Sequence, residues 1–237
     1  MKRVKVRRDS GCICEQIVYT APDKADVRTY RKRIRFRDAE QYAAFKDQCG
    51  RKRFAQMINA NYTPSSFKGT LTFSDAEELF SFADAKRIRQ IYVRRIRRRC
   101  PDAKIIIVMG RGKSTARIHF HYLMDGVSED VIRSAWTWGD IVECAHLRAH
   151  NYYDGVDHGR DYTGIANYYW EHWTAEQGGH HYYAARNHEA PQTEPAEEIK
   201  REYTPEKPPR TPKGYKLVEA KATPFGFLYF KYTKILS

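Results

Sequence analysis

The sequence contains no long hydrophobic run, no internal repeat and no low-complexity tract. Its longest apolar run, Ile105–Met109, is much shorter than the roughly 20 residues that span a bilayer. The basic start, Met1–Arg8, is not followed by an apolar stretch, so we expect neither a signal peptide nor a membrane anchor. The five cysteines are odd in number and scattered, which argues against a disulfide framework. These absences predict a soluble protein of the cytoplasm.

Acidic residues are scarce in the first part of the chain. Residues 1–100 contain 25 Lys and Arg against 11 Asp and Glu, a net charge of +14. Residues 101–237 contain 17 against 18, a net charge of −1. A basic region with clustered arginines is the electrostatic footprint of a nucleic-acid partner. An anionic membrane is the weaker alternative, because the sequence has no lipidation motif or anchor.

Prolines are concentrated in one stretch near the end of the chain. Six of the ten lie between Glu189 and Lys213, among Glu, Thr and Lys. Such a composition buries too little apolar surface to order itself, which predicts a linker. We therefore expect four consecutive segments, which are a basic N-terminal region (1–62), a main domain (63–188), a proline-rich linker (189–213) and a C-terminal β-hairpin (214–237).

The hydrophobic pattern of the main domain predicts alternating strands and helices. Apolar residues at every second position indicate strands, and apolar residues three or four apart indicate helices. Ser128 is suited to cap a helix that runs to Trp138 and stops at Gly139. The expected order is strand 69–73, helix 75–99, strand 104–109, turn 110–115, strand 117–123, helix 128–138, strand 140–147 and helix 162–173, preceded by a strand at 31–37 and a basic helix at 39–57. The β-α-β-β-α-β order predicts the α+β class, as a ferredoxin-like or RRM-like sandwich with a central antiparallel sheet.

Two histidines share one face of the strand at 117–123. Because side chains of a strand alternate, Ile118, Phe120 and Tyr122 point one way and His119 and His121 point the other. The apolar residues can pack under the helices, and the two imidazoles can converge on one metal ion. A His-x-His pair also arises by chance in a chain with nine histidines, so the motif alone is a weak signal.

The helix at 162–173 contains two adjacent tyrosines that we expect to play different parts. Tyr162, Ile165, Tyr169 and Trp173 form one apolar stripe, which predicts that Tyr169 belongs to the core. Tyr168 and His172 are four residues apart and lie together on an adjacent face. The alternative is that Tyr168 is an ordinary surface tyrosine.

Together these motifs resemble those of the HUH rolling-circle replication initiators, which are named for a His-hydrophobe-His motif. The resemblance covers about residues 65–190 and is greatest to the single-tyrosine initiators of bacterial phages, plasmids and integrating elements. The matching segments, in the order of the family's motifs, are Thr70–Phe73, His119–His121, Trp138-Gly139 and Gly164–Tyr168.

The resemblance implies an HUH endonuclease domain that nicks DNA and transfers strands. It implies that His119 and His121 hold Mn²⁺ or Mg²⁺ and that Tyr168 attacks the phosphodiester. The products would be a 5′-phosphotyrosine and a free 3′-hydroxyl that primes rolling-circle replication. The implied partners are single-stranded or hairpin origin DNA, a host helicase and a host polymerase, within a bacterial cell. The chemistry is consistent, because a phenol with a pKa near about 10 needs a cation or a base to become a good nucleophile.

The sequence departs from the family's pattern at two positions. Many relatives have a lysine three residues after the tyrosine, where this chain has Glu171. Many take a third metal ligand from the strand before the histidines, where this chain has Gly110. Transposases of the same class take a ligand from the tyrosine helix one turn on, which makes His172 the candidate third ligand. A surface histidine that only forms hydrogen bonds is the alternative.

The basic residues of the main domain are candidate DNA contacts, namely Arg87, Arg94, Arg98 and Lys113. Other functions remain open at this point. The same chemistry serves transposases and relaxases. A non-catalytic binder of single strands uses the same sandwich, but it needs stacking aromatics on the open sheet face. A metal-dependent nuclease that uses water would not need Tyr168.

Overall fold

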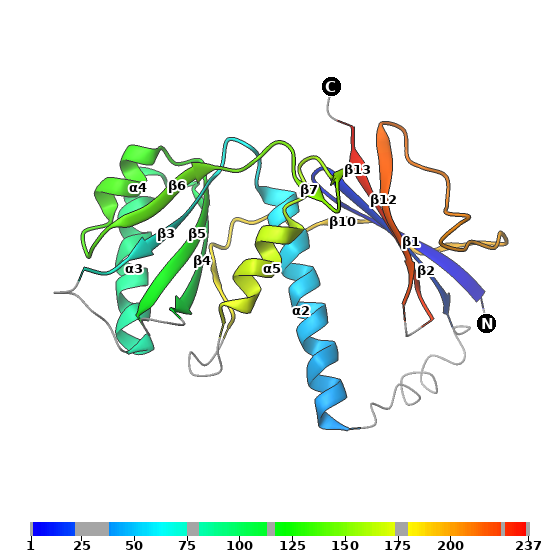
Figure 1. Cartoon of the computed structure of the whole chain (residues 1–237), viewed down its shortest axis with the longest axis horizontal. Helices are drawn as coiled ribbons and strands as arrows, with labels where there is room; N and C mark the ends of the chain where they lie inside the picture. Colours follow the sequence, from blue (N-terminus) through cyan, green and yellow to red (C-terminus); the bar gives the residue numbers. More distant parts are fainter. Residues whose placement is uncertain are drawn as a thin grey trace. The chain divides into compact units, whose positions relative to one another are not determined.

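The computed structural model describes residues 2–21, 38–74, 81–112, 117–173, 180–223 and 226–235. The chain divides into two compact units, both drawn in Figure 1. Unit 1 combines Met1–Ala60, His150–Asp161 and Ala190–Ser237, and unit 2 combines Asn61–Ala149 and Tyr162–Glu189. Among the described residues, no helix has the length and apolar character needed to span a membrane.

Unit 2 is an antiparallel sheet with helices on both sides (Figure 1). Its strands follow the order β6-β3-β5-β4-β9. The elements are β3 (Phe67–Thr72), α3 (Phe82–Arg99), β4 (Lys104–Arg111), β5 (Ile118–Asp125), α4 (Glu129–Ala135), β6 (Ile141–His146), α5 (Thr163–Glu171) and β9 (Tyr183–Ala184). The α+β class and the β-α-β-β-α-β order of elements from β3 to β6 are therefore confirmed.

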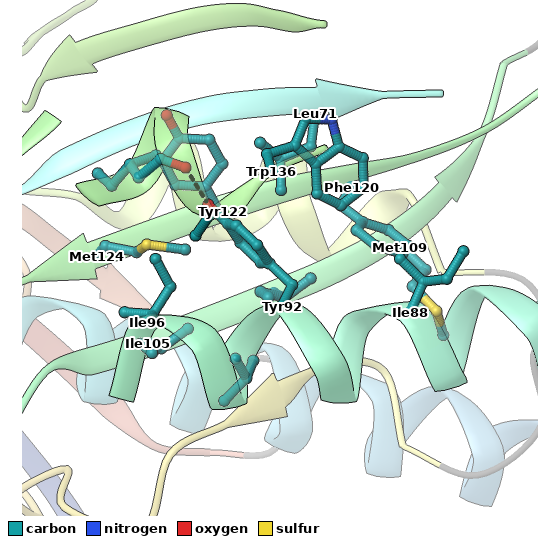
Figure 2. Packing of buried hydrophobic residues seen from close by; sticks show 14 of the residues in the cluster. Leu71, Ile88, Tyr92, Ile96, Ile105, Met109, Phe120, Tyr122, Met124 and Trp136 are labelled. Carbon is teal, nitrogen blue, oxygen red and sulfur yellow. Dashed lines mark hydrogen bonds between the residues drawn. The ribbon is translucent and has the colours of Figure 1, made fainter. Parts of the chain in front are cut away.

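The main core lies between the sheet and the helices α3 and α4. Ile118, Phe120 and Tyr122 of β5 are at most 2% exposed and belong to this core, as the alternation predicted. Figure 2 shows Phe120 and Tyr122 in the same cluster as Tyr92 of α3 and Trp136. The Tyr92 hydroxyl donates a hydrogen bond to the carbonyl of Ile132 in α4, at 3.2 Å. The odd-numbered residues of β5 therefore face away from α3 and α4.

Helix α5 covers part of that second face of the sheet. Its Tyr169 is buried, and its hydroxyl donates to the carbonyl of Tyr122 at 2.9 Å. Ala166 and Trp170 are also buried, whereas Ile165 is only partly covered. The apolar stripe of α5 is thus rotated slightly from the predicted one. The predicted phase of the tyrosines is confirmed, because Tyr169 is 3% exposed and Tyr168 is 52% exposed.

Some predicted element ends differ from those of the structure. Helix α3 begins after Ser81, whose hydroxyl accepts the Ala83 amide, and residues 75–80 lie outside the described residues. Strand β4 runs on to Arg111, so the predicted turn at 110 begins too early. Helix α4 ends at Ala135 and not at Trp138, because Trp136 adopts an extended conformation that buries its ring in the core.

Unit 1 is a second antiparallel sheet whose strands come from both ends of the sequence. Its order is β10-β1-β2-β13-β12, and β11 also pairs with β1. The elements are β1 (Lys2–Ser10), β2 (Ile13–Ala21), α2 (Ala39–Asn61), β7 (Tyr152–Tyr153), β8 (Val156–Asp157), β10 (Gln192–Thr193), β11 (Glu197–Glu198), β12 (Tyr215–Ala222) and β13 (Leu228–Lys234). The predicted basic helix and C-terminal hairpin are present, and the strand predicted at 31–37 lies outside the described residues.

The proline-rich segment, predicted as a linker, instead supplies strands β10 and β11. Its carboxylates pair with the basic strand β1, as in Lys2–Glu198 at 2.8 Å and Lys5–Glu197 at 2.9 Å. The composition predicted a segment that cannot order itself. Its ion pairs with the basic residues of β1 explain why it is nevertheless ordered. The four consecutive segments predicted from the sequence therefore differ from the two units, because unit 1 joins the first and last of them in one sheet.

Candidate metal centre

His119 and His121 project from the face of β5 that is opposite the main core. The two side chains lie close together, with 3.1 Å between their Nε2 atoms. His121 is only 5% exposed, and His119 is half-buried. Two nitrogen atoms of this kind bring their lone pairs toward the same point, which is the arrangement of ligands to one metal ion.

The third imidazole comes from His172, directly after α5. Its ring centroid lies 4.3 Å from that of His121 and 5.9 Å from that of His119. One ligand atom from each of the three histidines lies within 4.8 Å of the others. The predicted His119, His121 and His172 set is thus brought together, and it can hold a metal ion.

Hydrogen bonds on the far side of two rings leave Nε2 available. Nδ1 of His172 lies 2.7 Å from the carbonyl oxygen of Tyr168. Because a carbonyl oxygen only accepts, Nδ1 carries the proton and Nε2 of the neutral ring keeps its lone pair. Nδ1 of His121 lies 3.1 Å from Oγ1 of Thr70, which is its direct neighbour on β3. The Thr70 hydroxyl can donate or accept, and the tautomer in which Nδ1 of His121 donates to it leaves the Nε2 lone pair for a metal ion.

Burial keeps the paired imidazoles neutral. Burial, together with smaller contributions from the neighbouring His119 and His172, lowers the pKa of His121 to about 3. Burial also lowers the pKa of His119, although a hydrogen bond with the backbone of Arg117 opposes this effect. A neutral imidazole is the form that binds metal, so protons compete weakly for these two donors.

Gly110 provides the space that the three rings occupy. It pairs with His119 across β4 and β5. A Cβ atom at Gly110 would lie 2.9 Å from Nε2 of His119 and 3.1 Å from Cδ2 of His172. A larger residue at this position would therefore displace the two rings. Glycine leaves room for a third imidazole that comes from the end of α5.

Tyr168 and Tyr169 contact the histidines in different ways. The exposed ring of Tyr168 lies 4.4 Å from that of His172 and 5.3 Å from that of His121, between centroids. The buried ring of Tyr169 stacks on His121 at 5.2 Å, and its hydroxyl is held by the backbone. Burial raises the pKa of Tyr169. Of the two, only Tyr168 presents a phenol that an external substrate can reach.

A cleft of about 720 Å³ opens beside the histidines, and its lining includes Thr70, Arg117, His119, His121, Asp140 and Tyr168. Thr70, Arg117 and Asp140 were not among the site residues predicted from the sequence, although Thr70 begins one of the segments that carry the resemblance. Arg117 could have been found, since it lies two residues before His119 and strand alternation places the two on one face. Thr70 depends on the register of β3 against β5, for which the sequence carries no local signal.

The predicted DNA contacts are not part of this cleft. Arg87, Arg94 and Arg98 are exposed residues of α3, which covers the face of the sheet opposite the histidines. Arg87 also lies 3.9 Å from Asp84 in an i,i+3 ion pair. Lys113 lies outside the described residues.

Comparison of the chain with protein-family models, with curated proteins and with solved structures gives no match.

Proposed function

We propose that this protein is a metal-dependent DNA-nicking and strand-transfer enzyme with Tyr168 as its nucleophile. The proposal depends on one observation above all. An exposed phenol stands against two of three converging imidazoles, at the edge of an open cleft. The neighbouring Tyr169 is buried and its hydroxyl is hydrogen-bonded to the backbone, so it is not available to a substrate in the cleft.

The proposed reaction is a transesterification. The Tyr168 oxygen attacks a phosphorus atom of the DNA backbone and loses its proton, while the P–O3′ bond breaks and the 3′ oxygen takes up a proton. The products are a 5′-phosphotyrosine and a free 3′-hydroxyl. The covalent bond conserves the energy of the phosphodiester, so the reverse attack by a 3′-hydroxyl rejoins the strand.

The residues of the cleft suit this reaction. His119, His121 and His172 would hold a divalent cation, which stabilises negative charge that develops on the phosphate. Arg117 supplies a guanidinium in the same cleft, suited to orient a phosphate. A set of three imidazoles favours Mn²⁺ over Mg²⁺, since Mg²⁺ prefers oxygen ligands.

The fold and the order of motifs support a more specific proposal. The ferredoxin-like order of elements, with His119 and His121 on the strand β5 and Tyr168 on a following helix, is what an HUH endonuclease domain requires. We assign the chain to initiation of rolling-circle replication on single-stranded or hairpin origin DNA, in a bacterial host that provides helicase and polymerase. The open face of β3 and β5 carries threonines and histidines, which favours this assignment over a single-strand binder with stacking aromatics.

The experiment is a covalent-trapping assay. The full chain is incubated with labelled single-stranded DNA and Mn²⁺, then denatured and resolved by gel electrophoresis. We expect a labelled protein–DNA adduct that survives denaturation and disappears with EDTA.

Two conservative variants make this assay specific. Tyr168→Phe should fold, bind DNA and form no adduct, whereas Tyr169→Phe should still form it. An adduct with Tyr168→Phe would contradict the assignment of the nucleophile. Cleavage without any adduct, at a rate unchanged by Tyr168→Phe, would instead indicate a nuclease that uses water.

A further inference from the structure

A second hollow of unit 2 is lined by arginines and lies at α3 and α4, on the face of the sheet opposite the histidines. Its volume is about 300 Å³, and we call it the arginine pocket. Helix α3 supplies three arginines to it, and α4 with the segment after it supplies the rest. The lining residues are Arg95, Arg98, Arg99, Ser134, Ala135 and Thr137.

The pocket concentrates positive charge without any compensating carboxylate. Its lining contains no acidic residue. Within the described part of the chain, Arg95, Arg98 and Arg99 have no ion-pair partner, whereas Arg87 of α3 pairs with Asp84 and Arg133 of α4 pairs with Glu129. Like charges three and four residues apart destabilise a helix. Favourable interaction with the helix dipole accounts for cations in the last turn, but it does not require them to converge with Arg95 on one hollow.

Neutral contacts hold two of the guanidinium groups in place. Arg95 donates to the carbonyl of Ala135 at 3.0 Å and to Oγ1 of Thr137 at 2.8 Å, and it lies 4.5 Å over the ring of Trp138. Arg99 donates to Oγ of Ser134 at 2.5 Å. These acceptors orient the guanidinium groups and leave their charge unneutralised. A site that is oriented before binding loses less entropy when an anion binds.

The pocket also contains a hydroxyl that can donate to a ligand. Thr137 accepts a hydrogen bond from Arg95, and its own O–H has no acceptor among the described residues. Three guanidinium groups with a hydroxyl donor match the several acceptor oxygens of a phosphate. We propose that the arginine pocket binds a phosphate of the DNA backbone, as a second DNA site distinct from the cleft at the histidines.

The position of the pocket determines which phosphate it takes. His119 and His121 point away from α3, whereas the pocket lies on α3 and α4. A phosphate in the pocket therefore belongs to a different stretch of DNA from the one beside Tyr168. This inference rests on the proposed function for the identity of the polymer as DNA, and the pocket would anchor the substrate at a distance from the bond that is cut.

The test compares two arginines of one helix. Arg94 and Arg98 are both exposed and both lack an ion-pair partner among the described residues, but only Arg98 lines the pocket. Binding of a fluorescent single-stranded oligonucleotide to the full chain is measured by anisotropy at several salt concentrations, with EDTA to prevent cleavage. Arg98→Gln should weaken binding several-fold and reduce the salt slope by about one unit. Although the sequence also suggested Arg94 as a DNA contact, Arg94 lies outside the pocket, so Arg94→Gln should change the affinity less than about twofold.

A variant that leaves the charge unchanged distinguishes a specific phosphate site from nonspecific electrostatic attraction. Thr137→Val keeps the shape and charge of the pocket but removes the hydroxyl donor. It should therefore weaken binding without changing the salt slope. Equal losses for Arg94→Gln and Arg98→Gln, with no effect of Thr137→Val, would overturn the proposal in favour of a diffuse basic surface. Unchanged DNA affinity in Arg98→Gln would also overturn it. Stabilisation of the wild type but not of Arg98→Gln by inorganic phosphate would then identify a small phosphate as the ligand.

The covalent-trapping assay distinguishes failure of this inference from failure of the proposed function. If wild type forms the adduct with Mn²⁺ but binding is insensitive to Arg98→Gln, only the pocket assignment fails. If binding depends on Arg98 but no adduct forms, the pocket stands and the proposed chemistry fails.

Discussion

Replacement of Gly110 by alanine should disturb the candidate metal centre and leave the fold in place. Gly110 lies in the strand β4, so a β-carbon is compatible with its backbone and should stabilise the strand by about 0.5–1 kcal/mol. The added carbon would lie 2.9 Å from Nε2 of His119 and 3.1 Å from Cδ2 of His172, and both rings must therefore move. Each ring forced off its rotamer costs about 0.5–1.5 kcal/mol.

Two displaced rings thus cost about 1–3 kcal/mol, which corresponds to a loss of Mn²⁺ affinity of roughly fivefold to a hundredfold. Calorimetric titration of Mn²⁺ measures the affinity, and urea unfolding in EDTA measures stability. We expect the Mn²⁺ affinity to fall, whereas the stability in EDTA should change less, because the gain in the strand offsets part of the cost of the displaced rings. Wild-type affinity in Gly110→Ala would refute the reasoning.

A double-mutant cycle identifies the ring that is affected. His172→Ala removes one of the two crowded partners and should itself weaken Mn²⁺ binding. If Gly110→Ala acts through His172, its effect should shrink in the His172→Ala background. Strictly additive effects would show that the added carbon acts elsewhere.

Two further predictions concern the groups around His121. Thr70→Val removes the partner of His121 Nδ1 and should lower Mn²⁺ affinity about 10- to 100-fold, measured by calorimetry. Thr72→Val is the matched control. Oγ1 of Thr72 donates to the carbonyl of Asp140 and not to a histidine, so this variant should change the affinity little. The second prediction concerns pH. Since burial lowers the pKa of His121 to about 3, the unfolded chain with a pKa near about 6.5 binds a proton that the folded chain does not. Stability without metal should therefore fall as the pH drops below about 6.5, by about 2 kcal/mol at about pH 5 from His121 alone. Urea unfolding in EDTA should show this slope reduced in His121→Asn, and parallel profiles for the two proteins would contradict it.

The sequence predicted the elements whose signal is local. The alternation of β5 separated the core residues from the two histidines, and the phase of α5 separated Tyr168 from Tyr169. Both depend on the geometry of a single element, so neighbouring residues are sufficient to read them. The end of α4 was missed because the burial of Trp136 depends on α3 and β5, which are distant in sequence.

Unit 1 could not be predicted because its strand pairs are far apart in the sequence. In β1, Val4 pairs with Tyr19 and Glu198, and in β2, Val18 pairs with Leu228. No periodicity within a strand encodes such partners. The proline-rich segment was misread for the same reason, since its composition gave no sign that its carboxylates meet the cations of β1.

The source of the third imidazole has a mechanical consequence for the proposed reaction. His172 follows α5, and its Nδ1 is bonded to the backbone carbonyl of Tyr168. A ligand from a sheet strand would stay in place when α5 moves, but a ligand from α5 moves together with the nucleophile. Gly110 has no side chain that could act as a ligand from β4. The position of α5 therefore determines the positions of both the third imidazole and the phenol of Tyr168. In the proposed reaction, a displacement of α5 that withdraws Tyr168 from the phosphate would therefore also loosen the candidate metal site, so nucleophile and cation would be positioned as one group.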